Sequence, residues 1–267
     1  MCIEVPSDPT GLRILRMLVT AKKHFTQDLG RAEALLSHAN TLPSGELARD
    51  VLRASWMMAV GACDAYFSDA YADLIARALQ AKDLEPRVAI PDRLNKLKVP
   101  VVAVLRRSKD GWRWRMAARE LIESENVLSL EKISKLFNHF FRDKKRLLKE
   151  ETIESWILHR DAKDRLFGVS ATKYRAMAGV DKTAARKMAV ERSKTRFEEV
   201  FQRRHDCIHN CDRPKTALQD ISPVHVSKTL HDIGFLVSRS HEAFLEEFPE
   251  YLRSLGFAAV TRARVCQ

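Results

Sequence analysis

The segment 203–210 brings two arginines, two histidines, an aspartate and an asparagine together within eight residues. Imidazole groups exchange protons near neutral pH, and guanidinium groups bind phosphate through several N–H donors. Together these groups suit acid–base chemistry on a phosphate ester. Acid–base and phosphate-binding groups are gathered this tightly nowhere else in the sequence, so the segment is the candidate functional site.

The residue pattern predicts a helix over about 182–210, which carries this segment at its C-terminal end. At ~100° per residue, Arg204 falls on one stripe with four apolar residues, Phe197, Val200, Phe201 and Ile208. An arginine that faces a core or an interface is costly unless a partner pairs with it. A polar helix end explains late cationic residues through the helix dipole, but it does not explain an arginine inside an apolar stripe.

His205 and His209 are four residues apart, so they share a neighbouring face of the helix. Such a pair chelates zinc in many proteins, and Cys207 and Cys211 lie nearby. The cysteines, however, fall roughly 200° from the histidines on a continuous helix. A zinc site would need the helix to unwind or a ligand from elsewhere, so no metal ligand is assigned. Cys207 lies on the apolar side, where a free cysteine is more often a core residue than a nucleophile.

The chain is basic, with 46 Lys and Arg against 35 Asp and Glu and a formal net charge of +11. Such an excess favours a polyanionic partner, nucleic acid before an anionic membrane. Trp112, Arg113 and Arg115 interleave aromatic and cationic groups, as suits base stacking with phosphate contacts. An alternative is that Trp114 and Leu121 belong to an ordinary core stripe with the arginines on its wet side.

Only 9 Gly and 9 Pro interrupt the chain, which predicts an all-α protein. We expect long helices at about 10–39, 45–82, 182–210 and 223–248, and shorter helices at about 112–123, 129–148, 152–167 and 171–178. Residues 83–109 read as an irregular connection with one short helical turn. Pro249 is expected to end the last long helix, and residues 257–267 to form a loose C-terminal tail.

The N-terminus lacks a basic stretch followed by an apolar run, so it does not resemble a secretory leader. No apolar run reaches the ~18–20 residues that a membrane span needs. The five cysteines are scattered and odd in number, which is not typical of a disulfide framework. We expect a cytoplasmic protein without a membrane partner.

The spacing of Arg204 and His209, with a polar residue after the arginine, resembles the signature of the HEPN superfamily of helical ribonucleases. The surrounding sequence is most similar to the RiboL-PSP-HEPN branch, which shares an arginine pair before the pattern HDxxHN and a helix after it. The resemblance covers about 45–80 and 190–248. The family more often has Asn or Asp after the arginine, where this chain has His205.

The resemblance implies a single HEPN-type antiparallel helical bundle over 1–267, with 83–180 as a helical insertion within it. It implies a metal-independent endoribonuclease without a cofactor, which acts on RNA as a homodimer whose two Arg…His motifs face one another. Many relatives act as toxins or in anti-phage defence, so an antitoxin or regulatory protein is a possible partner.

Carried onto this chain, the resemblance gives His209 the role of assisting attack of the ribose 2′-hydroxyl on the adjacent phosphate. Arg204 would hold that phosphate, and the supporting residues His205, Asp206 and Asn210 would orient both groups. Internal attack needs a base that titrates near neutral pH and a cation to stabilise the phosphorane, but no metal. One chain supplies half of such a site, and a symmetric partner supplies the rest.

Two further supporting residues complete the candidate site. Arg203 forms the arginine pair with Arg204, and Asp64 is expected to accept a hydrogen bond from Arg204 or from a motif histidine. Two alternatives stay open. One is a non-catalytic HEPN module that binds RNA or a partner protein; the other is a helical metal-binding protein that uses His205 and His209.

Overall fold

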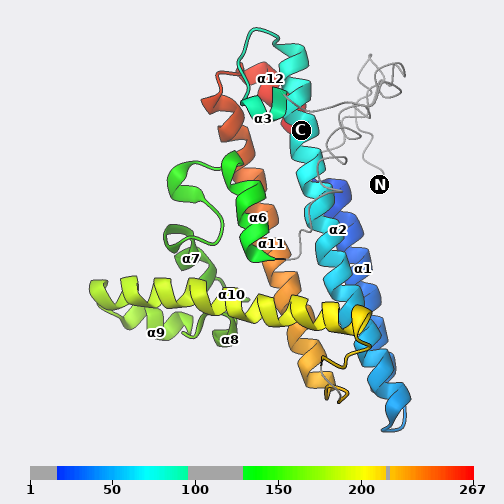
Figure 1. The fold of residues 1–267 in the computed structure, drawn as a ribbon. Coiled ribbons are helices and arrows are strands. Elements are labelled where there is room, and N and C mark those ends of the chain that lie inside the picture. The colour runs from blue at the N-terminus through cyan, green and yellow to red at the C-terminus, as the bar shows by residue number, and fades with distance from the viewer. Residues whose placement is uncertain (1–16, 96–128, 215–216) are drawn as a thin grey trace, which may run out of the picture.

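The computed structural model describes residues 17–95, 129–214 and 217–267, and every regular element in these ranges is helical. The all-α prediction is therefore confirmed for the described part of the chain. Three long helices lie side by side, and a fourth crosses them (Figure 1). They are α1 (Val19–Ala39), α2 (Glu46–Leu84) and α11 (Pro223–Ser254), crossed by α10 (Gly179–His209).

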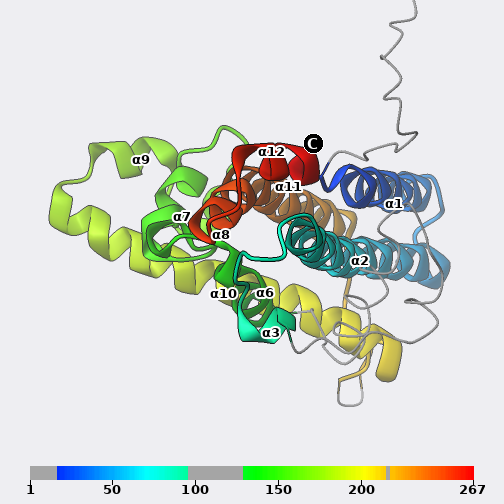
Figure 2. The same ribbon diagram turned by 90° about the horizontal axis from the view of Figure 1, so that it is seen from above.

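The α2 helix is the centre of this arrangement, because it packs against α1, α11, α10 and the C-terminal helix. Seen from above, α2 lies between α1 on one side and α10 on the other (Figure 2). Its inner faces carry aromatic and small apolar side chains that are almost completely buried, among them Trp56, Tyr66 and Phe67. Burial of these groups, rather than helix propensity, holds the long helices together.

An aromatic cluster joins α2 to the segment that follows the gap in the described chain. Phe137 of α6 (Leu130–Phe137) stacks on Phe244 with ring centroids 4.4 Å apart, and Phe67 meets Phe137 edge-on at 5.8 Å. The described part of the expected insertion thus packs on the same core as the long helices. Asp92–Asn95 forms the short helix α3 within the connection that was expected to be irregular with one short helical turn.

The helix expected over 129–148 is wrong beyond Phe137. Two 3₁₀ turns follow α6, η1 (Asn138–Phe140) and η2 (Asp143–Lys145). The Asn138 side-chain oxygen accepts a hydrogen bond from the Leu147 backbone amide at 2.6 Å, and its nitrogen donates one to the Leu147 carbonyl at 3.2 Å. These bonds close a compact loop in place of a helix. The helix expected over 152–167 is likewise two pieces, α7 (Glu150–Ile157) and α8 (Asp164–Phe167), and α9 (Ala171–Ala176) follows.

Two expectations about the C-terminus are also wrong. The α11 helix continues through Pro249 to Ser254, because Tyr251 and Leu252 are buried beyond it and their burial offsets the ~3 kcal/mol cost of the proline. The expected loose tail is the helix α12 (Ala259–Cys266), whose Val265 side chain is fully buried. Arg77 of α2 donates a hydrogen bond to the Val265 carbonyl and so ties α12 to α2.

Several expectations fall outside the described residues. They include the start of the first helix, most of the connection after residue 95, the helix at 112–123 and the residues Trp112, Arg113 and Arg115. Within the described ranges, every helix is too short or too polar to cross a membrane.

Candidate functional site

The last two turns of α10 leave the core, and this changes the expected setting of Arg204. Phe197, Val200 and Phe201 are buried as predicted, with 2%, 0% and 5% of their surface exposed. Ile208, the next apolar residue of the stripe, is 47% exposed, and Arg204 is half-buried. The stripe therefore runs out onto the surface, and Arg204 does not face the core.

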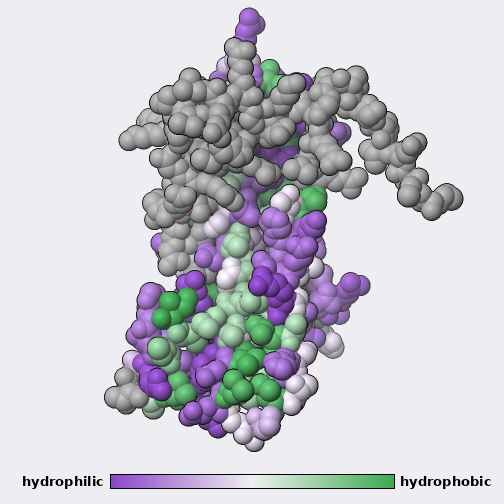
Figure 3. Space-filling model, turned by 90° about the vertical axis from the view of Figure 1, so that its right-hand side faces the viewer, coloured by the Kyte–Doolittle hydropathy of each residue, from purple (hydrophilic) through white to green (hydrophobic). Residues whose placement is uncertain are grey.

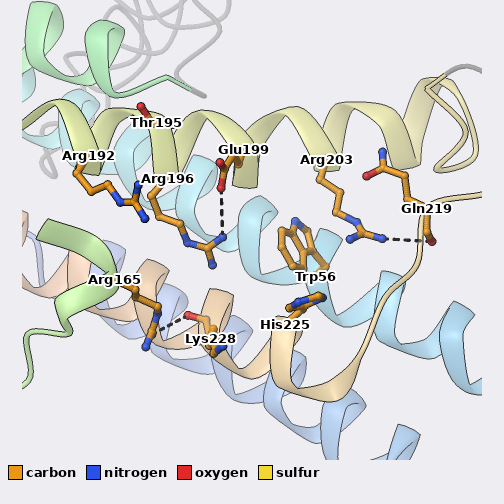
Figure 4. Close-up of a pocket in the computed structure, with 10 residues that line it drawn as sticks. All are labelled: Trp56, Arg165, Arg192, Thr195, Arg196, Glu199, Arg203, Gln219, His225 and Lys228. Carbon is orange, nitrogen blue, oxygen red and sulfur yellow. Dashed lines mark hydrogen bonds and ion pairs between the residues drawn. The ribbon is translucent and has the colours of Figure 1, made fainter. Parts of the chain in front are cut away.

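Arg203, the neighbour of Arg204, is the arginine that the fold holds in place. Its guanidinium carbon lies 5.3 Å from the centre of the Trp56 ring (Figure 4). Its Nη2 donates to the Asp220 carbonyl at 2.9 Å. The Trp56 indole in turn donates to the Val200 carbonyl at 3.2 Å. A cation over an aromatic face is favourable, and the contact fixes α10 against α2.

Asp212 links the end of α10 to α2. Its Oδ2 atom accepts hydrogen bonds from Arg53 Nε at 2.7 Å and Arg203 Nη2 at 2.9 Å, and its side chain is completely buried. We call these three residues the Asp212 clamp. A buried carboxylate between two guanidinium groups is strongly held, because removing any partner leaves a buried charge unpaired.

The backbone after α10 makes the clamp possible. Cys211 and Asp212 adopt φ values of 48° and 59°, in the left-handed region, and the Asp212 amide donates to the Asp206 carbonyl at 2.9 Å. The chain thus reverses within two residues and turns the Asp212 side chain back under the helix. An aspartate tolerates this conformation better than most residues do.

Asp206 faces inward and accepts hydrogen bonds from side-chain amides, not from Arg204, His205 or His209. It is 6% exposed and accepts hydrogen bonds from Gln202 at 2.9 Å, Gln219 at 3.2 Å and Asn210 at 3.5 Å. Within the described chain, neither Asp206 nor Asn210 bonds to the side chain of Arg204, His205 or His209. Both residues therefore stabilise the end of the helix, and they do not orient the arginine and histidines of the motif through direct hydrogen bonds.

The two histidines lie together on the outer side of the same turns. The rings of His205 and His209 are 4.4 Å apart at 43°, and both residues are exposed. Half-buried Asp64 of α2 lies close enough to Arg204 for the two charges to interact. Burial raises the pKa of Asp64, and the Arg204 charge offsets part of that rise. Among the described residues, Asp64 accepts no hydrogen bond from Arg204 or from either motif histidine, although one was expected.

The cysteines lie away from the histidine pair, as their spacing predicts. Burial, followed by the charge of Asp212, raises the pKa of Cys207 to about 11, which disfavours the reactive thiolate. Cys211 is exposed at the turn. In the part of the chain that the structure describes, no three His, Cys, Asp or Glu residues are grouped as metal ligands.

Arg53, Asp212 and Gln219 were not among the expected site residues, although all three hold the helix end. Arg53 offered one signal, because it precedes the long uncharged run that surrounds Asp64 in α2. Asp212 and Gln219 offered none, since only the tight reversal of the backbone brings them under α10. The supporting role assigned to Arg203 is thus a structural one, made through Asp212 and Trp56.

Sequence and structure comparisons find no family model, no curated protein and no solved structure that matches this chain.

Proposed function

We propose that the protein is a metal-independent endoribonuclease of the HEPN type, with Arg204 and His209 as its reacting groups. One observation carries the proposal: Arg204 and the paired rings of His205 and His209 lie exposed or half-buried on a helix end that the Asp212 clamp holds through two hydrogen bonds. Groups that must meet a reacting phosphate need solvent access and fixed positions at once.

In this proposal His209 accepts the proton of a ribose 2′-hydroxyl as its oxygen attacks the adjacent phosphorus. Arg204 binds the non-bridging oxygens and stabilises the charge that develops on them. A second imidazole donates a proton to the departing 5′-oxygen, so the products carry a 2′,3′-cyclic phosphate and a 5′-hydroxyl. The second imidazole comes from His205 or from the same motif in a second copy of the chain.

A surface of α2 beside the motif supports pairing of two copies. Leu47, Ala54, Met58, Gly61 and Ala65 follow one another at spacings of seven, four, three and four residues, and all are exposed or half-buried. We call this the α2 stripe, and Figure 3 shows apolar side chains gathered on the side of the molecule that α1 and α2 form. Small apolar residues on a helix face let a second helix approach closely.

The nuclease test uses purified full-length protein, mixed-sequence RNA and EDTA. Arg204→Ala and His209→Ala should each lower the cleavage rate by at least about a hundredfold, because each removes a group that acts in the transition state. Arg175→Ala and His38→Ala remove exposed residues of the same types elsewhere and should cleave like the wild type. The products should carry cyclic phosphate ends.

Two results would count against the proposal. Cleavage that survives in both motif variants would come from another site or from a contaminant. RNA binding without cleavage in the wild type would favour the non-catalytic module instead.

Gly61 gives a separate test of pairing. A Cβ atom added at Gly61 or at Gly30 of α1 meets nothing within 4 Å, so a larger side chain at either position begins in open space on the single chain. Gly61→Leu should weaken dimers measured by light scattering and lower cleavage in parallel, because the leucine side chain occupies the space on the α2 stripe into which the second copy would pack. Gly30→Leu is the matched control and should change neither. If both variants pair normally, the stripe is not the interface.

A further inference from the structure

A second candidate site lies on the other side of α10 from the histidine pair. It is a cavity of about 420 Å³ between α8, α10 and α11, with α2 at its floor, and cavities of this size bind small molecules in other proteins. Arg192, Arg196 and Arg203 line it from one face of α10, at successive spacings of four and seven residues. His205 and His209 fall on the opposite face at ~100° per residue. The cavity is therefore separate from the proposed catalytic groups.

One end of the cavity is built around a buried carboxylate. Asp232 of α11 is fully buried and binds two guanidinium groups, Arg165 through Nη2 at 2.5 Å and Arg196 through Nε at 2.9 Å. The single Asp232 carboxylate balances only one of the two guanidinium charges, so the three side chains together carry a net charge of one positive unit. The bonds also fix the direction in which both side chains reach the cavity.

Two further cations line the same end without partners of their own. Arg192 and Lys228 are exposed, and their side chains form no hydrogen bond or ion pair within the described chain. The one lining carboxylate, Glu199, is 65% exposed and lies 3.8 Å from Arg196. Burial and then the charge of Arg165 lower the pKa of nearby His231, which agrees with a positive potential at this end.

The other end of the cavity carries aromatic rings and an amide beside the guanidinium of Arg203, which lies over the Trp56 ring. Figure 4 shows Trp56, His225 and Gln219 together at this end, while the cations Arg165, Arg192, Arg196 and Lys228 lie at the opposite end. The Gln219 amide nitrogen donates to Asp206 at 3.2 Å, which leaves the amide oxygen as an acceptor. A flat ring with polar edges fits such surroundings, and phosphate groups fit the cationic end.

We propose that this cavity binds a nucleoside polyphosphate, with its phosphates among the four cations and its base beside Trp56 and His225. More than one phosphate is expected, because four cationic side chains face only two carboxylates, Asp232 and Glu199, which leaves two positive charges in excess. The inference stands apart from the proposed nuclease, since none of its cations is a reacting group there.

The test measures binding of ATP and GTP to the full-length protein by calorimetry in EDTA, beside AMP, inorganic tripolyphosphate and a short 5′-hydroxyl RNA. The double variant Arg192→Gln with Lys228→Gln removes two cations that hold nothing else in place, so the fold is retained. Lys187→Gln is the matched control, because Lys187 is exposed on α10 and does not line the cavity.

We expect at least one of the two triphosphates to bind at least tenfold more tightly than AMP and tripolyphosphate. Its dissociation constant should rise at least tenfold in the double variant and stay unchanged in the control. Three results would overturn the proposal: no binding of either triphosphate, equal binding by wild type and double variant, or tripolyphosphate binding as tightly as the nucleotides. RNA binding that falls with the double variant would also overturn it, because the cavity would then belong to a nucleic-acid surface.

Discussion

Asp212→Asn tests whether the Asp212 clamp holds the end of α10. The substitution keeps the size of the side chain and suits the left-handed backbone at φ 59°, because asparagine adopts this region readily. It removes only the negative charge between Arg53 and Arg203. Any loss of stability therefore reports on the charge pairing, not on a cavity or on backbone strain.

The size of the effect follows from the contacts. Two hydrogen bonds, at 2.7 and 2.9 Å, change from charge-assisted to neutral acceptors, and each change costs about 1–1.5 kcal/mol. The Arg53 side chain is only 8% exposed, so water compensates it poorly. We expect the free energy of unfolding to fall by about 2–4 kcal/mol.

Urea unfolding followed by far-UV circular dichroism measures this loss. Asp50→Asn is the matched control, because Asp50 pairs with the same arginine at 3.1 Å but is 67% exposed, and surface pairs contribute about 0–1 kcal/mol. A loss below about 0.5 kcal/mol for Asp212→Asn would refute the clamp, since it is smaller than a single charge-assisted hydrogen bond contributes. Equal losses for the two variants would refute the role of burial.

The structure makes three further predictions. Val265→Ala should lower the free energy of unfolding by about 1–3 kcal/mol in urea titrations, because its side chain is fully buried in the expected tail; no change would mean that α12 is not docked. Burial and the charge of Lys22 lower the pKa of His241 from 6.5 to about 4, so the unfolded state binds the proton first and stability falls as pH drops from 6.5 towards 4. His241→Gln should flatten that fall in unfolding measured against pH, and an unchanged slope would assign it to other groups. Iodoacetamide at pH 8 should label exposed Cys211 well before Cys207, whose pKa is raised to about 11; peptide mass spectrometry that finds equal rates would contradict the burial of Cys207.

The long helices were predictable because their signals are local. Pro43 and Gly45 interrupt the helical pattern between α1 and α2. Ser222 and Pro223 mark the start of α11, where the serine side chain accepts a hydrogen bond from the backbone of His225. The continuation of α11 through Pro249 was not predictable in this way. It depends on the burial of Phe248, Tyr251 and Leu252 by distant segments, which outweighs the local preference.

The candidate site shows the same contrast between local signals, which the sequence reveals, and contacts made by distant segments, which it does not. Helical spacing correctly placed His205 beside His209 and turned Cys207 away from them. It overestimated the burial of Arg204, because periodicity does not reveal where a helix projects beyond its core. The partners of Arg203 could not be inferred, since Asp212 reaches it only through the backbone reversal after α10.

The Asp212 clamp also bears on the order in which the chain acquires its final shape. Arg53 and Asp212 are 159 positions apart, so their contact closes most of the chain into one loop. During synthesis the N-terminal helices leave the ribosome first, and Arg53 has no Asp212 carboxylate to pair with until residue 212 has been made. A nascent or truncated chain that stops before residue 212 would therefore carry Arg204 on a frayed helix end. The contacts that hold the motif therefore form only after residue 212 has been made.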